Sequence, residues 1–378
     1  MNEFSFVKLK DIGEIVTGNT PKTSDSENYS SNDVPFLKPS DFGNDNITMA
    51  RTECFVSNHA KNQARILPVD SVAVTCIGVI GKVLVTDIEC AFNQQINAII
   101  PKSCFLSRYI AYAIMFQREI LQNRANAAVV PIINKSDFSN VQIPICSFEK
   151  QCEIVTVLDK LSTVINLRQK QLEKLDELVK SRFIEMFGDP VANSKNWNIS
   201  SLLSIGYCKN GMNFHTGDNG VDIRCLGVAD FKNLSVIDGT ENLPIVSLNE
   251  LPSKDSMLKD GDIVFVRSNG NKALVGRCLL VYPHNIPTTY SGFCIRFRLT
   301  SKQVMPEYLL RVLKSDSISK KMMGRGANIQ NLNQQILASL DIPIPPLDLQ
   351  NQFAEFVKQT DKSKADRQIE SCSADIYH

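Results

Sequence analysis

The most regular pattern of apolar and polar positions lies in the middle of the chain, at residues 147–187. This stretch has no Pro or Gly, and its apolar residues recur at alternating steps of three and four. A heptad repeat sustained over more than four heptads is typical of a coiled-coil helix, here about 60 Å long. Its predicted seam is Ile154, Leu158, Leu161, Ile165, Leu172, Leu175, Val179 and Met186, with Arg168 and Arg182 in the two remaining seam positions.

A different pattern lies on both sides of this helix. Short runs rich in β-branched residues and bounded by Gly, Asn and Asp predict strands. A helical pattern follows in each half, at residues 107–122 and 306–323, and each half then closes on an Ile-Pro-Ile strand. We therefore expect two mixed α+β domains. The predicted strands lie at residues 71–85, 96–100, 262–266, 277–282 and 294–299.

The two halves also resemble each other in sequence. Six short segments recur in the same order, with offsets between 189 and 199 residues. Order and spacing of this kind indicate a duplication. Among the recurring pairs are Gly18 with Gly211, Gly81-Lys82 with Gly276-Arg277, Tyr109 with Tyr308, and the stretch from Ile143 to Gln151 with that from Ile342 to Gln350.

A second, weaker helix is expected after the second half. Phe353 and Val357 match Ile154 and Leu158, but Thr360 and Lys364 replace the next two apolar seam residues. Helices that follow duplicated domains are related by a pseudo-twofold axis, so we expect an antiparallel coiled coil. The predicted organisation is a first domain at 1–146, the central helix at 147–187, a linker at 188–196, a second domain at 197–345, and a shortened helix and tail at 346–378.

The charge is balanced in total but uneven along the chain. There are 41 Lys and Arg against 40 Asp and Glu, which argues against a generally basic nucleic-acid coat. Residues 259–330, however, hold twelve basic against four acidic side chains, and residues 61–135 hold eight against four. Basic faces on otherwise acidic domains are typical of phosphate contact, although an ordinary solvated basic face is the alternative.

Both basic stretches also contain side chains suited to base edges. Arg and Lys pair with guanine, and Asn and Gln pair with adenine, in the major groove. Residues 268–272 are rich in Gly and Asn, which indicates an exposed loop, but Asn and Gly are equally common in turns that bind nothing. The candidate DNA-binding residues are Lys82, Asn93, Gln94, Gln95, Arg124, Arg267, Asn269, Asn271, Lys272, Arg277, Arg325 and Gln330.

Catalytic and metal-binding motifs are not found in the sequence. The eleven cysteines contain no Cys-x-x-Cys pair, and the four histidines are isolated. Gly78 to Lys82 resembles a phosphate loop, but its glycine spacing is too short and Val83 replaces the Ser or Thr that would bind magnesium. No apolar stretch is long enough to span a membrane. We therefore expect a cytoplasmic, non-catalytic protein without a cofactor or metal of its own.

Several motifs together carry a resemblance to a known family. They are the segment from Ile342 to Gln350 and its first-half copy ending in Gln151, the helical segment 172–190, the Gly18-Asn-Thr-Pro21 sequence, and the segment 258–262. In this combination and layout the chain resembles the specificity subunit of type I restriction-modification systems.

The resemblance implies a function for the whole chain. Each globular domain would be a target recognition domain that reads one half of a split, asymmetric site in double-stranded DNA. The helices would set the distance between the half-sites and dock two methyltransferase subunits. Restriction subunits would add translocation and cleavage. Adenine methylation and cleavage would then be performed by the partners, which would hold S-adenosylmethionine, ATP and magnesium.

Two alternatives remain open at this point. Two globular domains on a coiled-coil stalk are also compatible with an adaptor that has no DNA role. The polar character of the second helix after Thr360 departs from the family pattern. Such a chain is compatible with a truncated or recombined specificity subunit that is inactive.

Overall fold

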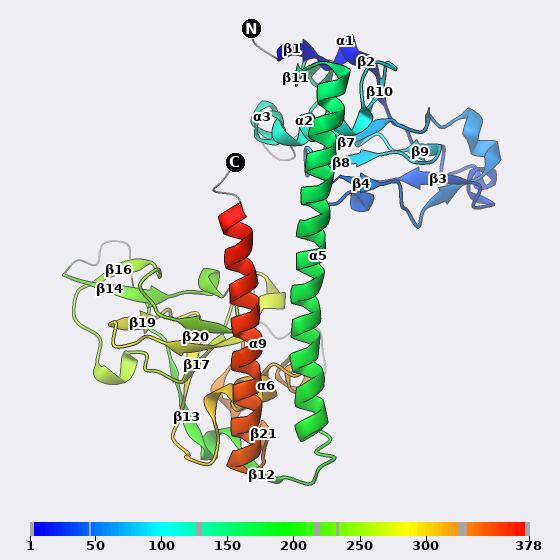
Figure 1. The fold of residues 1–378 in the computed structure, drawn as a ribbon. Helices are drawn as coiled ribbons and strands as arrows, with labels where there is room; N and C mark the ends of the chain where they lie inside the picture. Colours follow the sequence, from blue (N-terminus) through cyan, green and yellow to red (C-terminus); the bar gives the residue numbers. More distant parts are fainter. Residues whose placement is uncertain are drawn as a thin grey trace. The chain divides into compact units, whose positions relative to one another are not determined.

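The fold consists of two compact units that divide the long central helix α5 (Phe148–Phe187) between them (Figure 1). The computed structural model describes residues 4–44, 47–125, 131–214, 220–231, 234–323 and 331–374. Unit 1 comprises residues 1–167 and unit 2 residues 168–378. The two units have the same internal plan, so the expected duplication of a mixed α/β domain is confirmed.

Unit 1 is built on a five-stranded sheet with strand order β2-β10-β7-β8-β4, antiparallel except for the β8–β4 pair. Side chains alternate between its two faces, as the period of a strand requires. Val72 and Val74 pack with Ile110 and Ile114 of helix α2, whereas Ala73 packs on the opposite face. The elements are α1 (Leu9–Ile12), β2 (Gly13–Thr17), β4 (Thr48–Met49), β7 (Val72–Thr75), β8 (Val83–Val85), β10 (Ile96–Pro101), α2 (Ser107–Phe116), α3 (Arg118–Arg124) and α4 (Lys135–Ser139).

Two smaller sheets complete unit 1. One has the order β5-β3-β9-β6 and contributes Leu37, Leu67 and Phe92 to the core on the Ala73 side. The other pairs the first strand of the unit with the Ile-Pro-Ile strand that leads into α5. The latter pairing attaches the start of the long helix to the start of the chain. The strands are β1 (Ser5–Lys8), β3 (Val34–Leu37), β5 (Phe55–Val56), β6 (Ile66–Leu67), β9 (Cys90–Phe92) and β11 (Gln142–Ile145).

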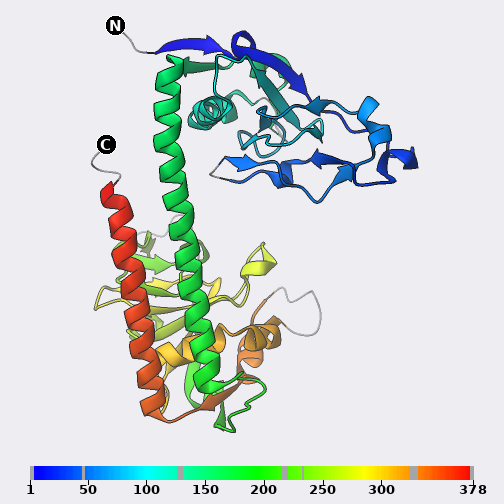
Figure 2. The same ribbon diagram turned by 45° about the vertical axis from the view of Figure 1, so that its right-hand side comes forward.

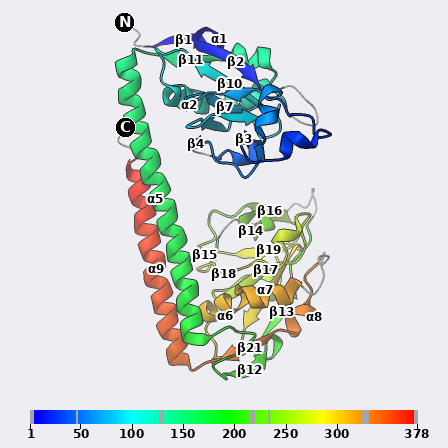
Figure 3. The ribbon, with the colours of Figure 1, turned by 90° about the vertical axis from the view of Figure 1, so that its right-hand side faces the viewer.

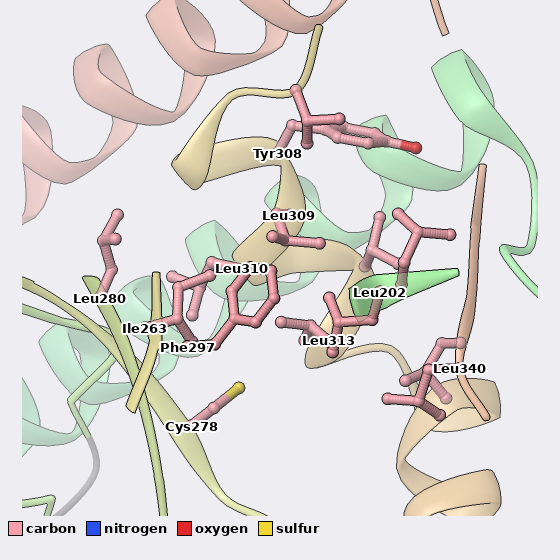
Figure 4. Packing of buried hydrophobic residues seen from close by; sticks show 14 of the residues in the cluster. Leu202, Ile263, Cys278, Leu280, Phe297, Tyr308, Leu309, Leu310, Leu313 and Leu340 are labelled. Carbon is pink, nitrogen blue, oxygen red and sulfur yellow. The ribbon is translucent and has the colours of Figure 1, made fainter. Parts of the chain in front are cut away.

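Unit 2 repeats this plan with the strand order β13-β20-β17-β18-β15 (Figure 3). Helix α6 covers one face of the sheet, and Figure 4 shows Leu310 of this helix beside Phe297 and Ile263 of the sheet. A sheet of order β16-β14-β19 contributes Leu226 and Tyr290 to the core on the other side, and β12 pairs with β21. The elements are β12 (Asn198–Ser201), β13 (Gly206–Asn210), β14 (Val221–Leu226), β15 (Val236–Asp238), β16 (Ile245–Leu248), β17 (Asp262–Val266), β18 (Cys278–Tyr282), β19 (Thr288–Tyr290), β20 (Cys294–Leu299), α6 (Pro306–Leu313), α7 (Asp316–Met323), α8 (Gln334–Ala338), β21 (Asp341–Ile344) and α9 (Leu347–Ala374).

The second half of α5 and helix α9 lie side by side in unit 2 and run in opposite directions (Figures 1 and 2). Val179 of the predicted seam is buried, as are Phe353 and Val357 of α9. Leu172, Leu175 and Met186 are partly buried. Phe183 and Phe187 also enter this core, although the heptad pattern did not include them. They pack against Tyr308 and Phe353 with ring centroids between 4.8 and 5.9 Å apart.

In unit 1 the predicted seam is less covered. Ile154 and Leu158 are partly buried near the start of α5. Leu161 and Ile165 are 48% and 67% exposed. Their assignment to a coiled-coil or subunit interface therefore stays a prediction.

Several of the residues that recur between the halves fasten the long helices to their domains. The Gln151 side chain accepts a hydrogen bond from the backbone N–H of Leu106 (3.0 Å) and donates one to the Cys146 carbonyl (3.0 Å). Gln350 accepts from the backbone N–H of Met305 (2.8 Å) and donates to the Gln303 and Pro345 carbonyls.

The matching tyrosines make an equivalent bond in each unit. The Tyr109 and Tyr308 hydroxyls donate to the Pro144 and Pro343 carbonyls, both at 2.9 Å. The repeated Gln and Tyr residues thus serve the joint between domain and helix.

Candidate nucleic-acid interface

One edge of each five-stranded sheet gathers the loops that hold most of the candidate residues. The strands alternate in direction, so the end of β2, the start of β10, the end of β7 and the start of β8 all lie at the same edge. We call this the loop edge. It comprises residues 18–20, 76–82 and 93–95 in unit 1 and residues 211–213, 267–277 and 291–293 in unit 2.

Backbone hydrogen bonds hold the loops of each edge together. In unit 1 the N–H of Asn19 donates to the Phe92 carbonyl (3.0 Å), and the N–H of Cys76 donates to the Gln95 carbonyl (2.9 Å). In unit 2 the N–H of Met212 donates to Tyr290 (3.0 Å), and that of Arg267 to Phe293 (2.8 Å). The two loop edges therefore have the same internal connections.

The recurring glycines Gly18 and Gly211 are explained by this close contact. A Cβ on Gly18 would collide with the carbonyl oxygens of Phe92 and Asn93, and one on Gly211 with those of Tyr290 and Ser291. Only glycine lets the backbone approach so closely at these two positions.

The segment before the last short helix of each domain closes the same edge. The N–H of Gly78 donates to the Pro131 carbonyl (3.0 Å), and the N–H of Ile133 donates to the Cys76 carbonyl (2.9 Å). In unit 2 the N–H of Leu332 donates to the Arg267 carbonyl (2.8 Å). Arg325 and Gln330, two of the candidates, precede this segment and lie outside the described residues.

Unit 1 places four candidates at its loop edge, in different environments. Asn93 is only 9% exposed, and its carboxamide bonds to the backbone N–H and the side chain of Gln95, both at 3.1 Å. Gln94 is exposed, and its Oε1 accepts a hydrogen bond from the Thr20 hydroxyl (2.6 Å). This bond does not use the side-chain NH₂ group, which is a hydrogen-bond donor. Lys82 donates to the Phe42 carbonyl (3.3 Å). Arg124 is the last residue of α3, and its side chain is outside the described set.

Unit 2 places five candidates in the loop between β17 and β18. Asn269 Oδ1 accepts from the N–H of Asn271 (2.8 Å), and Asn271 Oδ1 accepts from the N–H of Ala273 (3.1 Å). Both carboxamide oxygens therefore shape the loop. Lys272 and Arg277 are exposed, whereas Arg267 is partly buried and donates to the Gly292 carbonyl (3.4 Å). Which of these side chains contacts a base stays a prediction.

Sequence reasoning missed several residues of the unit 1 edge. Asn19 accepts from the N–H of Arg65 (2.8 Å) and donates to the Gln63 carbonyl (2.7 Å). The exposed Arg65 also donates through Nη1 to the Thr17 carbonyl. The motif that begins at Gly18 was the available signal for Asn19 and Thr20. No local signal marks Arg65, which comes to this edge only through the fold.

Part of the basic charge in residues 259–330 is internal. Arg296 on β20 is 0% exposed, and its guanidinium lies 4.9 Å from the centre of the Tyr207 ring and 3.4 Å from Asp255 Oδ1. Arg298 donates to both carboxylate oxygens of the buried Asp262, at 2.8 and 2.7 Å. These two arginines are therefore committed to the domain interior. The basic side chains of this stretch that are exposed are Lys259, Lys272, Arg277, Lys302, Lys320 and Lys321.

The carboxylate of Asp255 also belongs to this cluster and accepts hydrogen bonds from several of its members. Hydrogen bonds from Lys209 (2.9 Å) and Tyr207 (3.0 Å) are the main causes that lower its pKa to about 2. Asp255 is therefore ionised at neutral pH, and its carboxylate links the side chains of Tyr207, Lys209 and Arg296.

Several cysteines of the described residues are buried, and no cluster of metal ligands is found among those residues. Among these residues no group of three or more His, Cys, Asp or Glu side chains is placed to hold a metal ion. Burial raises the pKa of the thiols of Cys76, Cys225 and Cys294 to about 12, so they are protonated and unreactive at neutral pH. No helix in the described ranges has the length and apolar character of a membrane span.

Comparison with known proteins gives the same family for both units. The type I restriction modification DNA specificity domain matches residues 1–177 and again residues 195–370. The StySPI specificity subunit of Salmonella potsdam is 26% identical over 375 residues, which covers 92% of this chain and 80% of that protein. The EcoKI specificity subunit of Escherichia coli K12 is 23% identical over 381 residues, with the same coverage of each chain.

Solved structures share the fold across the whole chain. The S subunit of the type I system of M. genitalium superposes with a TM-score of 0.52 at 14% identity, covering 100% of this chain and 94% of that one. A chain from a structure of type I restriction-modification complex assembly gives a TM-score of 0.52 at 16% identity, with coverages of 97% and 95%. The two domain matches together span nearly the whole sequence, and the chain belongs to the family of type I restriction-modification DNA specificity domains, of which it carries two copies.

Proposed function

We propose that this chain is the DNA sequence-recognition subunit of a type I restriction-modification complex and that each unit reads one half of a bipartite site. The observation that carries the proposal is the loop edge, which occurs twice with the same backbone connections and different side chains. Two equivalent edges with different contact residues suit two different half-sites. The target is therefore asymmetric, with an unread spacer between its halves.

The chemistry of the loop edges supports readout in the major groove. Exposed Gln94 in unit 1 and exposed Lys272 and Arg277 in unit 2 present donors of the kinds that pair with adenine, guanine and phosphate. The carboxamide oxygens of Asn93, Asn269 and Asn271 accept hydrogen bonds from backbone N–H groups of their own loops. These bonds hold the loops in one conformation before DNA binds. Preorganisation of this kind reduces the entropy cost of binding.

The chemical steps are assigned to partner subunits. Specificity subunits of type I enzymes give the complex its sequence choice, and we propose two methyltransferase subunits and the restriction subunits as the partners of this chain. S-adenosylmethionine, ATP and magnesium would be held by those partners, which methylate adenine or cleave DNA in the cytoplasm. The apolar positions on α5, including the exposed Leu161 and Ile165, offer contact area for such partners.

The test of this function is single-molecule methylation sequencing of DNA from cells that express the chain with its cognate methyltransferase. We expect one bipartite methylated motif with two different halves. Gln94→Ala should relax only the first half-site and Lys272→Ala only the second, because each good base contact is worth about 1–3 kcal/mol of discrimination. Lys302→Ala, at the opposite edge of the unit 2 sheet, is the matched control and should leave the motif unchanged. If no bipartite motif is found with the wild-type chain, the chain is an inactive copy or an adaptor.

The role of α5 as a spacer is tested by shortening it. Deletion of one heptad from residues 158–171 removes about 10 Å of helix. We expect the methylated motif to keep both half-sites and to change only in spacer length. Altered half-sites with an unchanged spacer would contradict this role. The control is a variant in which the same seven residues are replaced by a different heptad sequence, so that the helix keeps its length but loses those side chains.

A further inference from the structure

A cavity of about 290 Å³ lies beside the loop edge of unit 2, between the start of β18 and helices α6 and α7. The residues around it combine apolar walls with two basic side chains and one hydroxyl. Its size is close to the lower end of small-molecule pockets, roughly 300–1,000 Å³. The lining residues are Phe231, Leu234, Gly276, Arg277, Cys278, Leu313, Lys314 and Ser319.

The same place in unit 1 is filled by a side chain. Gly81 is the repeat counterpart of Gly276, and both have φ of +83°. A Cβ on Gly81 would lie 2.8 Å from Cγ of Arg118, the first residue of α3. Arg118 Nη1 then donates to the Asn44 carbonyl at 2.7 Å.

In unit 2 the equivalent position is open. A Cβ on Gly276 would meet no atom within 4 Å. Helix α7 contributes Ser319 to the lining of this space, whereas in unit 1 Arg118 of α3 occupies the space beside Gly81. The space beside this glycine is therefore filled in unit 1 and open in unit 2.

The described lining of the cavity favours an anion. It includes Arg277 and Lys314 and no carboxylate. Lys314 Nζ donates to the Ser235 hydroxyl (2.8 Å) and the Leu234 carbonyl (3.4 Å). Burial lowers the pKa of Lys314, so an anion next to its ammonium would stabilise the charged form. The Ser319 hydroxyl adds a neutral hydrogen-bond donor to the same space.

We propose that this cavity binds a phosphate group, and that in the DNA complex the group is a backbone phosphate next to the second half-site. This inference rests on the proposed function, since Gly276 and Arg277 belong to the loop edge of unit 2. Arg277 at the rim and Lys314 inside the cavity contact the phosphate oxygens. Such a contact fixes the position of unit 2 on the duplex without reading a base.

The test uses the chain reconstituted with its methyltransferase subunits and a duplex that contains the methylated motif. Dissociation constants are measured between 50 and 300 mM salt for the wild type, Lys314→Gln and Lys314→Arg. For Lys314→Gln we expect about tenfold weaker binding on matched and mismatched duplexes alike, and a slope of log K against log salt that is smaller by about 1. Lys314→Arg keeps the charge and should keep the slope.

Two further variants separate a phosphate contact from other effects. Lys302→Gln makes the same charge change at the opposite edge of the sheet and should leave the slope unchanged. Ser319→Leu fills the cavity with an apolar side chain and should reproduce the smaller slope with the native Lys314 in place. Thermal unfolding of each variant shows whether unit 2 remains folded. If Lys314→Gln is folded and its salt slope equals that of the wild type, the DNA phosphate contact is refuted while the proposed function stands.

A measurement with inorganic phosphate distinguishes a DNA backbone phosphate from free phosphate as the ligand of the cavity. Phosphorus NMR line broadening with the complex alone measures whether free phosphate enters the cavity and whether Lys314→Gln abolishes it. Broadening that depends on Lys314, without a change in the DNA salt slope, assigns the cavity to free phosphate. If neither measurement depends on Lys314, the cavity binds no phosphate. If the wild-type complex binds no duplex at all, the proposed function fails independently of this outcome.

Discussion

The two units attach their long helices through the same bonds to backbone groups but through different contacts between side chains. In both, a Gln at the start of the long helix and a Tyr on α2 or α6 bond to backbone groups. Beyond these bonds, unit 1 uses an ion pair, in which Arg108 on α2 binds both oxygens of Asp159 on α5 at 2.5 to 3.0 Å. At the matching positions unit 2 has Glu307 and Lys358, whose charges are reversed.

Unit 2 replaces the ion pair by an aromatic cluster. Phe183 and Phe187 of α5, Tyr308 of α6 and Phe353 of α9 contact one another in the buried core. Bonds to the backbone survived duplication because the main chain supplies the same groups whatever the sequence. Contacts between two side chains need both partners, so they diverged together. The comparison predicts that the two joints differ in strength and in their response to pH.

The largest expected effect is the loss of the aromatic joint. Phe353→Ala removes a fully buried ring and should lower the free energy of unfolding of unit 2 by about 3–5 kcal/mol. Denaturant unfolding of the full chain, followed by hydrogen exchange in each unit, measures it. Phe116→Ala, the same substitution at a side chain that is 85% exposed, should change little. Equal losses from both variants would mean that the cluster does not hold the joint.

A smaller effect is expected from the ion pair of unit 1. Asp159→Asn should destabilise unit 1 by about 1 kcal/mol, because the hydrogen bonds from Arg108 and Tyr112 are charge-assisted but both members of the pair are partly exposed. A double-mutant cycle with Arg108→Gln gives the coupling energy. Lys358→Gln is the matched change in unit 2 and should have almost no effect. A coupling energy near zero would show that Arg108 and Asp159 act independently.

The pH dependence of the same pair has a defined sign. Burial would raise the pKa of Asp159, but hydrogen bonds from Arg108 and Tyr112 outweigh it and lower the pKa. The stabilisation is therefore complete above the unfolded-state pKa of about 3.9 and is lost as pH falls through the lower folded-state pKa. In the wild type, unit 1 should lose the stabilisation due to ionised Asp159 as the pH falls. The Asp159→Asn variant lacks this stabilisation at every pH, so its unit 1 should not show this loss.

The smallest expected effect is the acid sensitivity that Asp255 gives to unit 2, where it lies next to a buried arginine of the sheet. Where unit 1 has Ala98 in its apolar core, the register of the repeat places the buried Arg296 in unit 2, close to the exposed Asp255. Because the pKa of Asp255 is lowered to about 2, its contribution is present above the unfolded pKa of about 3.9 and is lost as pH falls towards 2. Asp255→Asn should remove this acid sensitivity from unit 2, measured as the denaturant midpoint between pH 5 and 2. An unchanged pH profile would contradict the assigned role of Asp255.

The sequence predicted the regular parts of the fold because they carry long periodic signals. The heptad pattern located α5 within one residue, and the Ile-Pro-Ile strands and their preceding helices follow from local patterns. Strands such as β5 and β6 contain two residues, which is too short for any period to be recognised. Phe183 and Phe187 escaped the heptad pattern because they face α6 of their own domain as well as α9.

The candidate site was predicted less completely, for a physical reason. Most of the candidates chosen from the sequence lie at one sheet edge in the structure, but the sequence could not separate exposed charges from buried ones. Arg296 and Arg298 counted as surface charge, yet their partners Tyr207, Asp255 and Asp262 lie far away in the sequence. Asn93 has the composition of a base-reading residue and is largely enclosed in its own turn. Burial depends on distant segments, and residue type alone does not report it.

The joints made by Gln151 and Gln350 bear on how such a chain can evolve. Each joint is a side chain bonded to main-chain groups at the start of a helix, on the side of the domain away from the loop edge. Substitutions among the loop residues therefore leave the direction in which the helix departs from the sheet unaltered. New binding preferences can accumulate at one end of a domain while its mechanical connection at the other end is inherited intact.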